Sequence, residues 1–118
     1  MDTSKSSNSK GNAVGRAFLF SGRPDPTWPV PPDIVRRLLE IWESLPLSPA
    51  GLPPVPPLGY RGCSLTDTAG WEWTTYGGVV RLHTPDDTQV RRDDTRSFEM
   101  TLLTSAPVGA LPPSLLAK

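Results

Sequence analysis

One histidine and the two aspartates that follow it are the residues that could bind a metal ion or transfer protons. His83 is the only histidine in the chain, and Asp86 and Asp87 follow within the same short segment. A histidine with two carboxylates can hold a catalytic metal or act in general acid and base catalysis. The two aspartates also follow Pro85, and aspartate is favoured at such turn positions because its side chain bonds to the backbone. A small metal-dependent or acid/base enzyme is therefore only the alternative function, and we expect no cofactor.

Cys63, the only cysteine, is the candidate nucleophile. It could be activated by His83 only if the two were adjacent across strands, and the expected order of strands places another strand between them. We therefore expect Cys63 to be a small buried apolar side chain. A single cysteine forms no intramolecular disulfide and, with one histidine, cannot form a structural zinc site of the Cys/His type, which favours a reducing, cytoplasmic location.

A loop that combines arginine, aspartate and tryptophan between prolines is the first candidate for binding. Residues 20–28 read Phe-Ser-Gly-Arg-Pro-Asp-Pro-Thr-Trp. Two prolines fix the backbone, so the loop would present Arg23, Asp25 and Trp28 with little loss of entropy. Aromatic and arginine side chains on a preformed loop are typical of binding hot spots. The structural alternative is that Trp28 covers the core and Arg23 pairs with Asp25.

A second motif, Gly-Tyr-Arg-Gly at residues 59–62, adds Tyr60 and Arg61 to the candidate partner-binding residues. Together with the proline-framed loop, Trp73 and the segments 76–80 and 96–99, it resembles a set of small uncharacterised bacterial proteins. These proteins pair a Phe-Ser-Gly-Arg-Pro-x-Pro-x-Trp loop with a Gly-Tyr-Arg-Gly strand. The resemblance covers roughly residues 15 to 106. It implies one natural unit, and it implies no activity and no functional residue.

The charge balance disfavours a nucleic-acid partner. Twelve basic and twelve acidic residues give a formal net charge of zero, and no stretch carries the run of like charges that a phosphate backbone attracts. No apolar run approaches the roughly 18 residues that span a bilayer, so we expect no membrane partner. The polar N-terminal segment has no hydrophobic core of the kind found in secretory signals.

The 15 prolines and 10 glycines divide the chain into intervals where regular structure can form. The spacing of apolar residues predicts a strand at 13–21, an extended loop at 22–32, a helix at 33–45, strands at 60–66, 71–76 and 79–83, and an Asp-capped helix at 95–105. Gly77 and Gly78 either turn the chain or form a bulge in one long strand, and we favour the turn. The order β-α-β-β-β-α predicts an α+β fold, with a small, mainly antiparallel sheet and two helices packed on one face.

Three segments follow from these intervals. Residues 1–12 are predicted to be a flexible polar tail, 13–106 a single domain, and 107–118 a proline-containing C-terminal tail. The prolines at 53–57 have the spacing of a polyproline ligand, although a stiff spacer explains them better. We expect a non-enzymatic protein-interaction or accessory module whose partner is another protein. An open sheet edge could also pair with a second copy of the chain.

Overall fold

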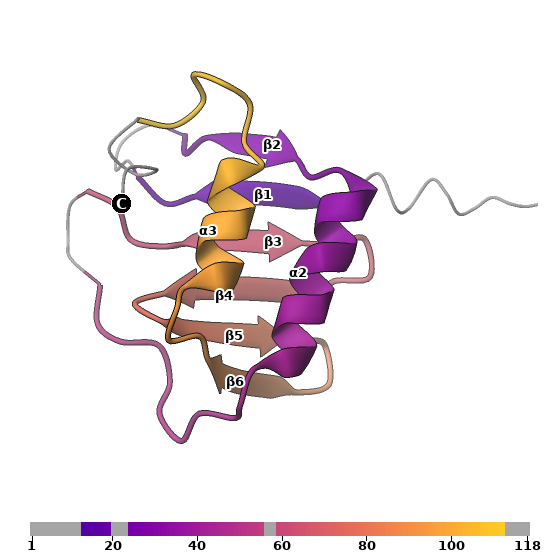
Figure 1. Ribbon diagram of the computed structural model, residues 1–118, viewed down its shortest axis with the longest axis vertical. Coiled ribbons are helices and arrows are strands. Elements are labelled where there is room, and N and C mark those ends of the chain that lie inside the picture. Colours follow the sequence, from indigo (N-terminus) through magenta and orange to yellow (C-terminus); the bar gives the residue numbers. More distant parts are fainter. Residues whose placement is uncertain (1–12, 20–23, 56–58, 113–118) are drawn as a thin grey trace, which may run out of the picture.

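Two helices lie on the same face of a six-stranded antiparallel sheet (Figure 1). The computed structural model describes residues 13–19, 24–55 and 59–112. In chain order the elements are β1 (Val14–Ala17), β2 (Thr27–Pro29), α2 (Pro32–Ser44), β3 (Cys63–Thr66), β4 (Glu72–Tyr76), β5 (Val79–His83), β6 (Thr88–Arg92) and α3 (Ser97–Thr104). The order across the sheet is β2-β1-β3-β4-β5-β6. The predicted α+β class is confirmed.

Two of the six strands lie where the sequence analysis predicts none, and both are at the edges of the sheet. β2 interrupts the predicted loop at 22–32, because proline is tolerated in an edge strand, where its missing N–H costs no hydrogen bond within the sheet. β6 carries threonine, glutamine, valine and two arginines, so its sequence lacks the apolar alternation that marks an inner strand.

The outer side of β6 is paired with the segment that follows α2. The Ser48 amide donates to the Val90 carbonyl at 2.9 Å, and the Arg92 amide donates to the Pro46 carbonyl at 2.8 Å. An isolated bridge joins Leu47 to β6 between them. The chain itself therefore covers this edge of the sheet.

The outer side of β2 offers few hydrogen-bonding groups. The Val30 amide donates to the Ala13 carbonyl in the direction of β1. Because amides alternate in direction along a strand, those of Thr27 and Pro29 face away from the sheet. Proline has no N–H, so β2 presents a single outward donor. The open edge that the sequence analysis allowed is therefore very short.

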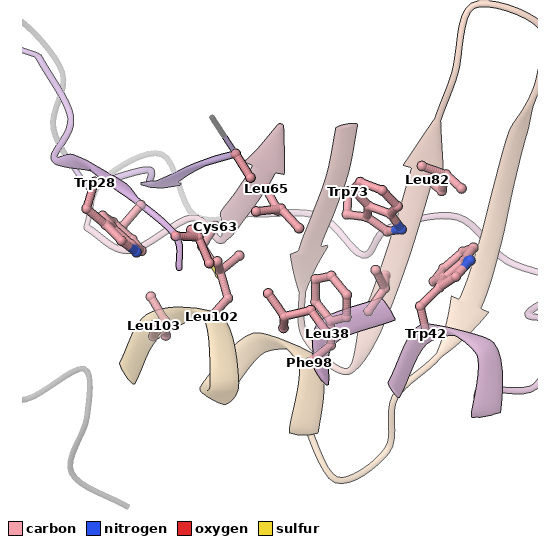
Figure 2. Close-up of a cluster of buried hydrophobic side chains, with 14 of the residues drawn as sticks. Trp28, Leu38, Trp42, Cys63, Leu65, Trp73, Leu82, Phe98, Leu102 and Leu103 are labelled. Atoms are coloured by element: carbon pink, nitrogen blue, oxygen red, sulfur yellow. The ribbon is translucent and has the colours of Figure 1, made fainter. Parts of the chain in front are cut away.

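The core fills the space between the sheet and the helices (Figure 2). Cross-strand register places Leu65, Trp73 and Leu82 in one row over β3, β4 and β5. Leu38 of α2 and Phe98 of α3 belong to the same buried cluster. The alternation of apolar residues in β4 and β5 is thus explained by one face packed against helices.

The first helix agrees with its predicted bounds to within one residue. Proline at its first position and Asp33 in its first turn suit a helix N-terminus, and Pro46 prevents it from continuing. Its buried residues, Leu38 and Trp42, are four apart and so lie on one face. None of the described helices is long and apolar enough to cross a membrane.

The second helix begins two residues later than predicted, because Arg96 takes a left-handed conformation with φ of 58°. The buried carboxylate of Asp93 accepts hydrogen bonds from the amides of Ser97 at 3.0 Å and Phe98 at 2.7 Å. These amides have no partner within the helix. Asp93 therefore caps these amides as predicted, although Arg96, three residues later, occupies the N-cap position itself.

The segment Gly77-Gly78 forms a turn rather than a bulge. Both residues have positive φ, 63° and 83°, which a two-residue type I′ hairpin requires. The amide of Asp93 also donates to the Gly78 carbonyl at 2.8 Å. The favoured interpretation of this pair is confirmed.

The packed unit extends past residue 106. Leu111 is buried and belongs to the core cluster. A turn closed by the Ala110 amide and the Pro107 carbonyl, at 3.0 Å, precedes it. The predicted C-terminal tail therefore begins too early, because a short turn allows the chain to return to the core.

Candidate functional site

Most of the motif segments of the sequence meet at one end of the sheet, which we call the loop end. It comprises the described parts of residues 18–26, with 59–62, 76–78 and 93–96. The Phe18 amide donates to the Gly62 carbonyl at 2.9 Å, and the Arg61 amide donates to the Phe18 carbonyl at 2.8 Å. These bonds extend the pairing of β1 with β3 into the loops, so the loop end has a defined backbone.

Asp25 fixes the shape of the proline-framed loop. One carboxylate oxygen accepts a hydrogen bond from the Leu19 amide at 2.8 Å, and the other lies 3.8 Å from Nε of Arg16. Its side chain is only 10% exposed. Asp25 thus holds the two sides of the loop together instead of projecting into solvent. Arg23 lies outside the described residues.

Trp28 belongs to the core, which corrects the expectation that the loop presents its indole at the surface. Its exposed fraction is 2%, and its Nε1 donates to Oγ of Ser105 at 2.9 Å. A Cβ added to Gly15 would lie 2.6 Å from the Trp28 ring, so the indole packs where only glycine leaves room. The structural alternative, in which Trp28 covers the core, describes this residue.

Tyr60 and Arg61 are half-buried at the loop end. The Tyr60 ring lies against that of Tyr76, with centroids 6.0 Å apart and planes tilted by 49°. The Tyr76 hydroxyl has no hydrogen-bond partner among the described residues. The two phenol rings form the aromatic part of the loop end, and Arg61 follows Tyr60 in the chain.

A buried polar cluster that the sequence did not predict lies behind the two rings. The Tyr60 hydroxyl donates to the carboxylate of Glu99, which is fully buried on α3. Nε of Arg96 donates to the other Glu99 oxygen at 3.1 Å. Cys63, at the start of β3, interacts with both Tyr60 and Glu99. The spacing of Arg96 and Glu99 suggests a surface ion pair, and nothing in the sequence places it beneath Tyr60.

The surroundings of the Tyr60 hydroxyl and the Cys63 thiol keep both groups protonated at neutral pH. Burial raises the pKa of the Tyr60 hydroxyl far above its usual range, and the neighbouring Cys63 and Glu99 raise it further. Burial also raises the pKa of the Cys63 thiol, and the neighbouring Tyr60 hydroxyl lowers it to a smaller extent. The hydrogen bond to Glu99 raises the pKa of Arg96, which therefore stays charged. The expected burial of Cys63 is confirmed, and its thiol is a poor nucleophile at neutral pH.

The residues considered for metal binding do not form a joint site. His83 and Thr88 line a hollow on the sheet face away from the helices, and His83 Nδ1 lies 2.9 Å from Thr88 Oγ1. Asp87 lines a different hollow with Leu82, whose side chain is on the helix face. Among the residues that the structure describes, no three of histidine, cysteine, aspartate or glutamate could hold a metal ion together.

The strand order also separates Cys63 from His83, as predicted. β3 and β5 lie on opposite sides of β4, so the two residues are not on neighbouring strands. Comparison of the chain with protein-family models, with curated proteins and with solved structures finds no match.

Proposed function

We propose that the chain is a non-enzymatic protein-interaction module whose contact surface is the loop end. The observation that carries the proposal is that hydrogen bonds within the chain already hold this surface in a defined conformation. Backbone bonds join Phe18 to residues 61 and 62, and Asp25 closes the loop through the Leu19 amide. A surface ordered in advance loses little entropy when it binds.

The polar cluster beneath this surface supports a structural role for its acids. Glu99 and Cys63 are both fully buried, so a substrate could not reach them without unfolding the loop end. The thiol and phenol remain protonated, while catalysis by these groups requires a nucleophile or base near neutral pH. The Tyr60–Glu99 bond instead fixes one aromatic ring of the surface to α3.

The side chains at the loop end suit contact with another protein. Tyr60 and Tyr76 are half-buried residues with their rings in contact, and Arg61 and the exposed Pro24 and Thr27 belong to the adjoining segments. Tyrosine and arginine are enriched where interfaces gain most of their binding energy. The expected roles of Tyr60 and Arg61 stay part of the proposal, whereas Asp25 and Trp28 act by shaping the surface.

Two further parts of the proposal concern location and assembly. We place the module in the cytoplasm, which its single buried thiol supports, since such a residue forms no stabilising disulfide. Pairing of sheet edges into a homo-oligomer has little support, because the segment after α2 occupies one edge and Pro29 weakens the other.

Site-specific photo-crosslinking of the full chain tests the contact surface. A benzophenone amino acid replaces Tyr76 in one variant and the exposed Leu39 of α2 in a control, and both are irradiated in the cells that make the protein. We expect a discrete cross-linked product from position 76 and none from position 39. Protease should remove this product, and Arg61→Glu should reduce its amount. Equal products from both positions, or a product that nuclease removes, would contradict the proposal.

A further inference from the structure

The exposed tryptophan Trp71 lies at the end of the sheet opposite the loop end, next to a hollow. The side chains that line this hollow are those of Trp71, Leu82, Thr84, Asp87 and Gln89. Trp71 is 41% exposed, whereas the other three tryptophans are 2–3% exposed. Its indole is held against the buried Trp73 ring, with centroids 5.9 Å apart. A large aromatic face is therefore fixed in position and open to solvent.

The turns around the hollow are acidic. Asp67 belongs to the turn between β3 and β4, and Asp86 and Asp87 belong to the turn between β5 and β6. The two turns are adjacent, since a Cβ added to Gly70 would lie 3.9 Å from Pro85. The carboxylates of Asp86 and Asp87 have no partner among the described residues. An unpaired carboxylate beside an indole face is suited to a cation.

Among the residues that the structure describes, no basic group forms an ion pair with Asp86 or Asp87. Arg81 and His83 line the hollow on the other face of the sheet. Arg91, two residues after Gln89, donates to the Gln89 side chain at 2.9 Å and lies over the Trp42 ring, 4.4 Å from its centroid. Trp42 thus has a guanidinium of this chain over its ring, and Trp71 has none among the described residues.

We propose that the hollow at Trp71 binds the cationic side chain of an arginine or lysine in a partner polypeptide. The aliphatic part of that side chain would cover Leu82 and the Trp71 ring, and its charged end would reach the Asp87 carboxylate. Preorganisation supports this assignment. The Asp67 carboxylate accepts a hydrogen bond from the Trp71 amide at 3.0 Å, and the Thr84 hydroxyl accepts one from the Asp87 amide at 3.0 Å. These bonds hold the backbone of both residues in place. The site is separate from the loop end and does not depend on the function proposed there.

A charge-matched pair of peptides tests this site on the full chain. The indole N–H resonance of Trp71, assigned by its loss in Trp71→Phe, is followed by NMR during titration with acetyl-Gly-Arg-Gly-amide. The control peptide carries citrulline, which has nearly the shape of arginine without its charge. We expect a saturable shift with the arginine peptide, a much smaller one with citrulline, and weaker binding as salt is added.

Two isosteric variants locate the charge that binds the peptide. Asp87→Asn is expected to weaken binding about fivefold, as the loss of one charge beside a cation–π contact should. Asp94→Asn removes an exposed carboxylate at the other end of the sheet and should leave binding unchanged. Equal shifts from the two peptides, no saturation, or equal effects of the two variants would overturn the assignment.

Discussion

The hydroxyl of Tyr60 donates a hydrogen bond to the buried carboxylate of Glu99 and thereby ties the loop before β3 to helix α3. A carboxylate that is shielded from water depends on such donors, and Arg96 supplies the other one. This contact joins the aromatic surface of the loop end to the core, so its loss should affect stability and binding together.

Tyr60→Phe should lower the free energy of unfolding by about 2 kcal/mol, because it removes a hydrogen bond to the buried carboxyl group of Glu99. Tyr76→Phe is the matched control, since its hydroxyl has no partner among the described residues, and it should change stability by less than about 0.5 kcal/mol. Urea unfolding followed by tryptophan fluorescence measures both. Equal losses in the two variants would show that the Tyr60–Glu99 bond does not stabilise the fold.

Asp93→Ala should destabilise the protein by about 2 kcal/mol, because two amides at the start of α3 lose their acceptor in a buried position. Asp94→Ala changes the adjacent carboxylate, whose side chain is 76% exposed, and should cost less than about 0.5 kcal/mol. Thermal unfolding of both variants compares them directly. The account of the helix cap is wrong if the two substitutions have the same effect.

Gly15→Ala should destabilise the protein by about 1–3 kcal/mol, since the added methyl group would overlap the Trp28 ring. The same change in a Trp28→Phe background should cost less, because the smaller ring leaves space for the methyl group. A double-mutant cycle of unfolding free energies measures this difference as a coupling energy. Additive effects would show that Gly15 is not needed for the close approach of the indole.

Stability should fall as the pH rises above about 8.5, where about half of the unfolded molecules have lost the cysteine proton. The folded protein keeps that proton because burial raises the pKa of Cys63, so the unfolded state binds fewer protons than the folded state. The free energy of unfolding should fall by on the order of 1 kcal/mol per pH unit between pH 8.5 and 9.5, and Cys63→Ala should make this fall smaller. A slope that is the same with and without Cys63 would rule out this source of pH dependence.

The inner part of the fold could be predicted from the sequence because its signals are local. Alternation around Trp73 and Leu82 marks two inner strands, and prolines bracket the helix that carries Leu38. The edge strands gave no such signal. β2 contains Pro29, which argues against a central strand, and β6 has no apolar alternation because edge strands need none.

The site was harder to predict because its contacts join residues far apart in the chain. Glu99 follows Phe98 in a helix, and only the packing of α3 on β3 shows that Glu99 faces Tyr60. Trp28 and Trp71 are equally apolar, and each follows a turn-forming segment. Only the positions of Gly15 and of the helices decide that the first is buried and the second exposed.

Equilibrium binding of the protein cross-linked from position 76 tests the central claim most directly. Once that partner is purified, its affinity is measured for the unmodified chain, for Arg61→Glu at the loop end, and for Arg81→Glu, a half-buried arginine on the open face of the sheet. The account predicts that Arg61→Glu lowers the affinity at least tenfold, which corresponds to about 1.4 kcal/mol of binding free energy. Arg81→Glu should change the affinity no more than twofold. Unchanged affinity of Arg61→Glu, or equal losses in both variants, would contradict a contact surface at the loop end.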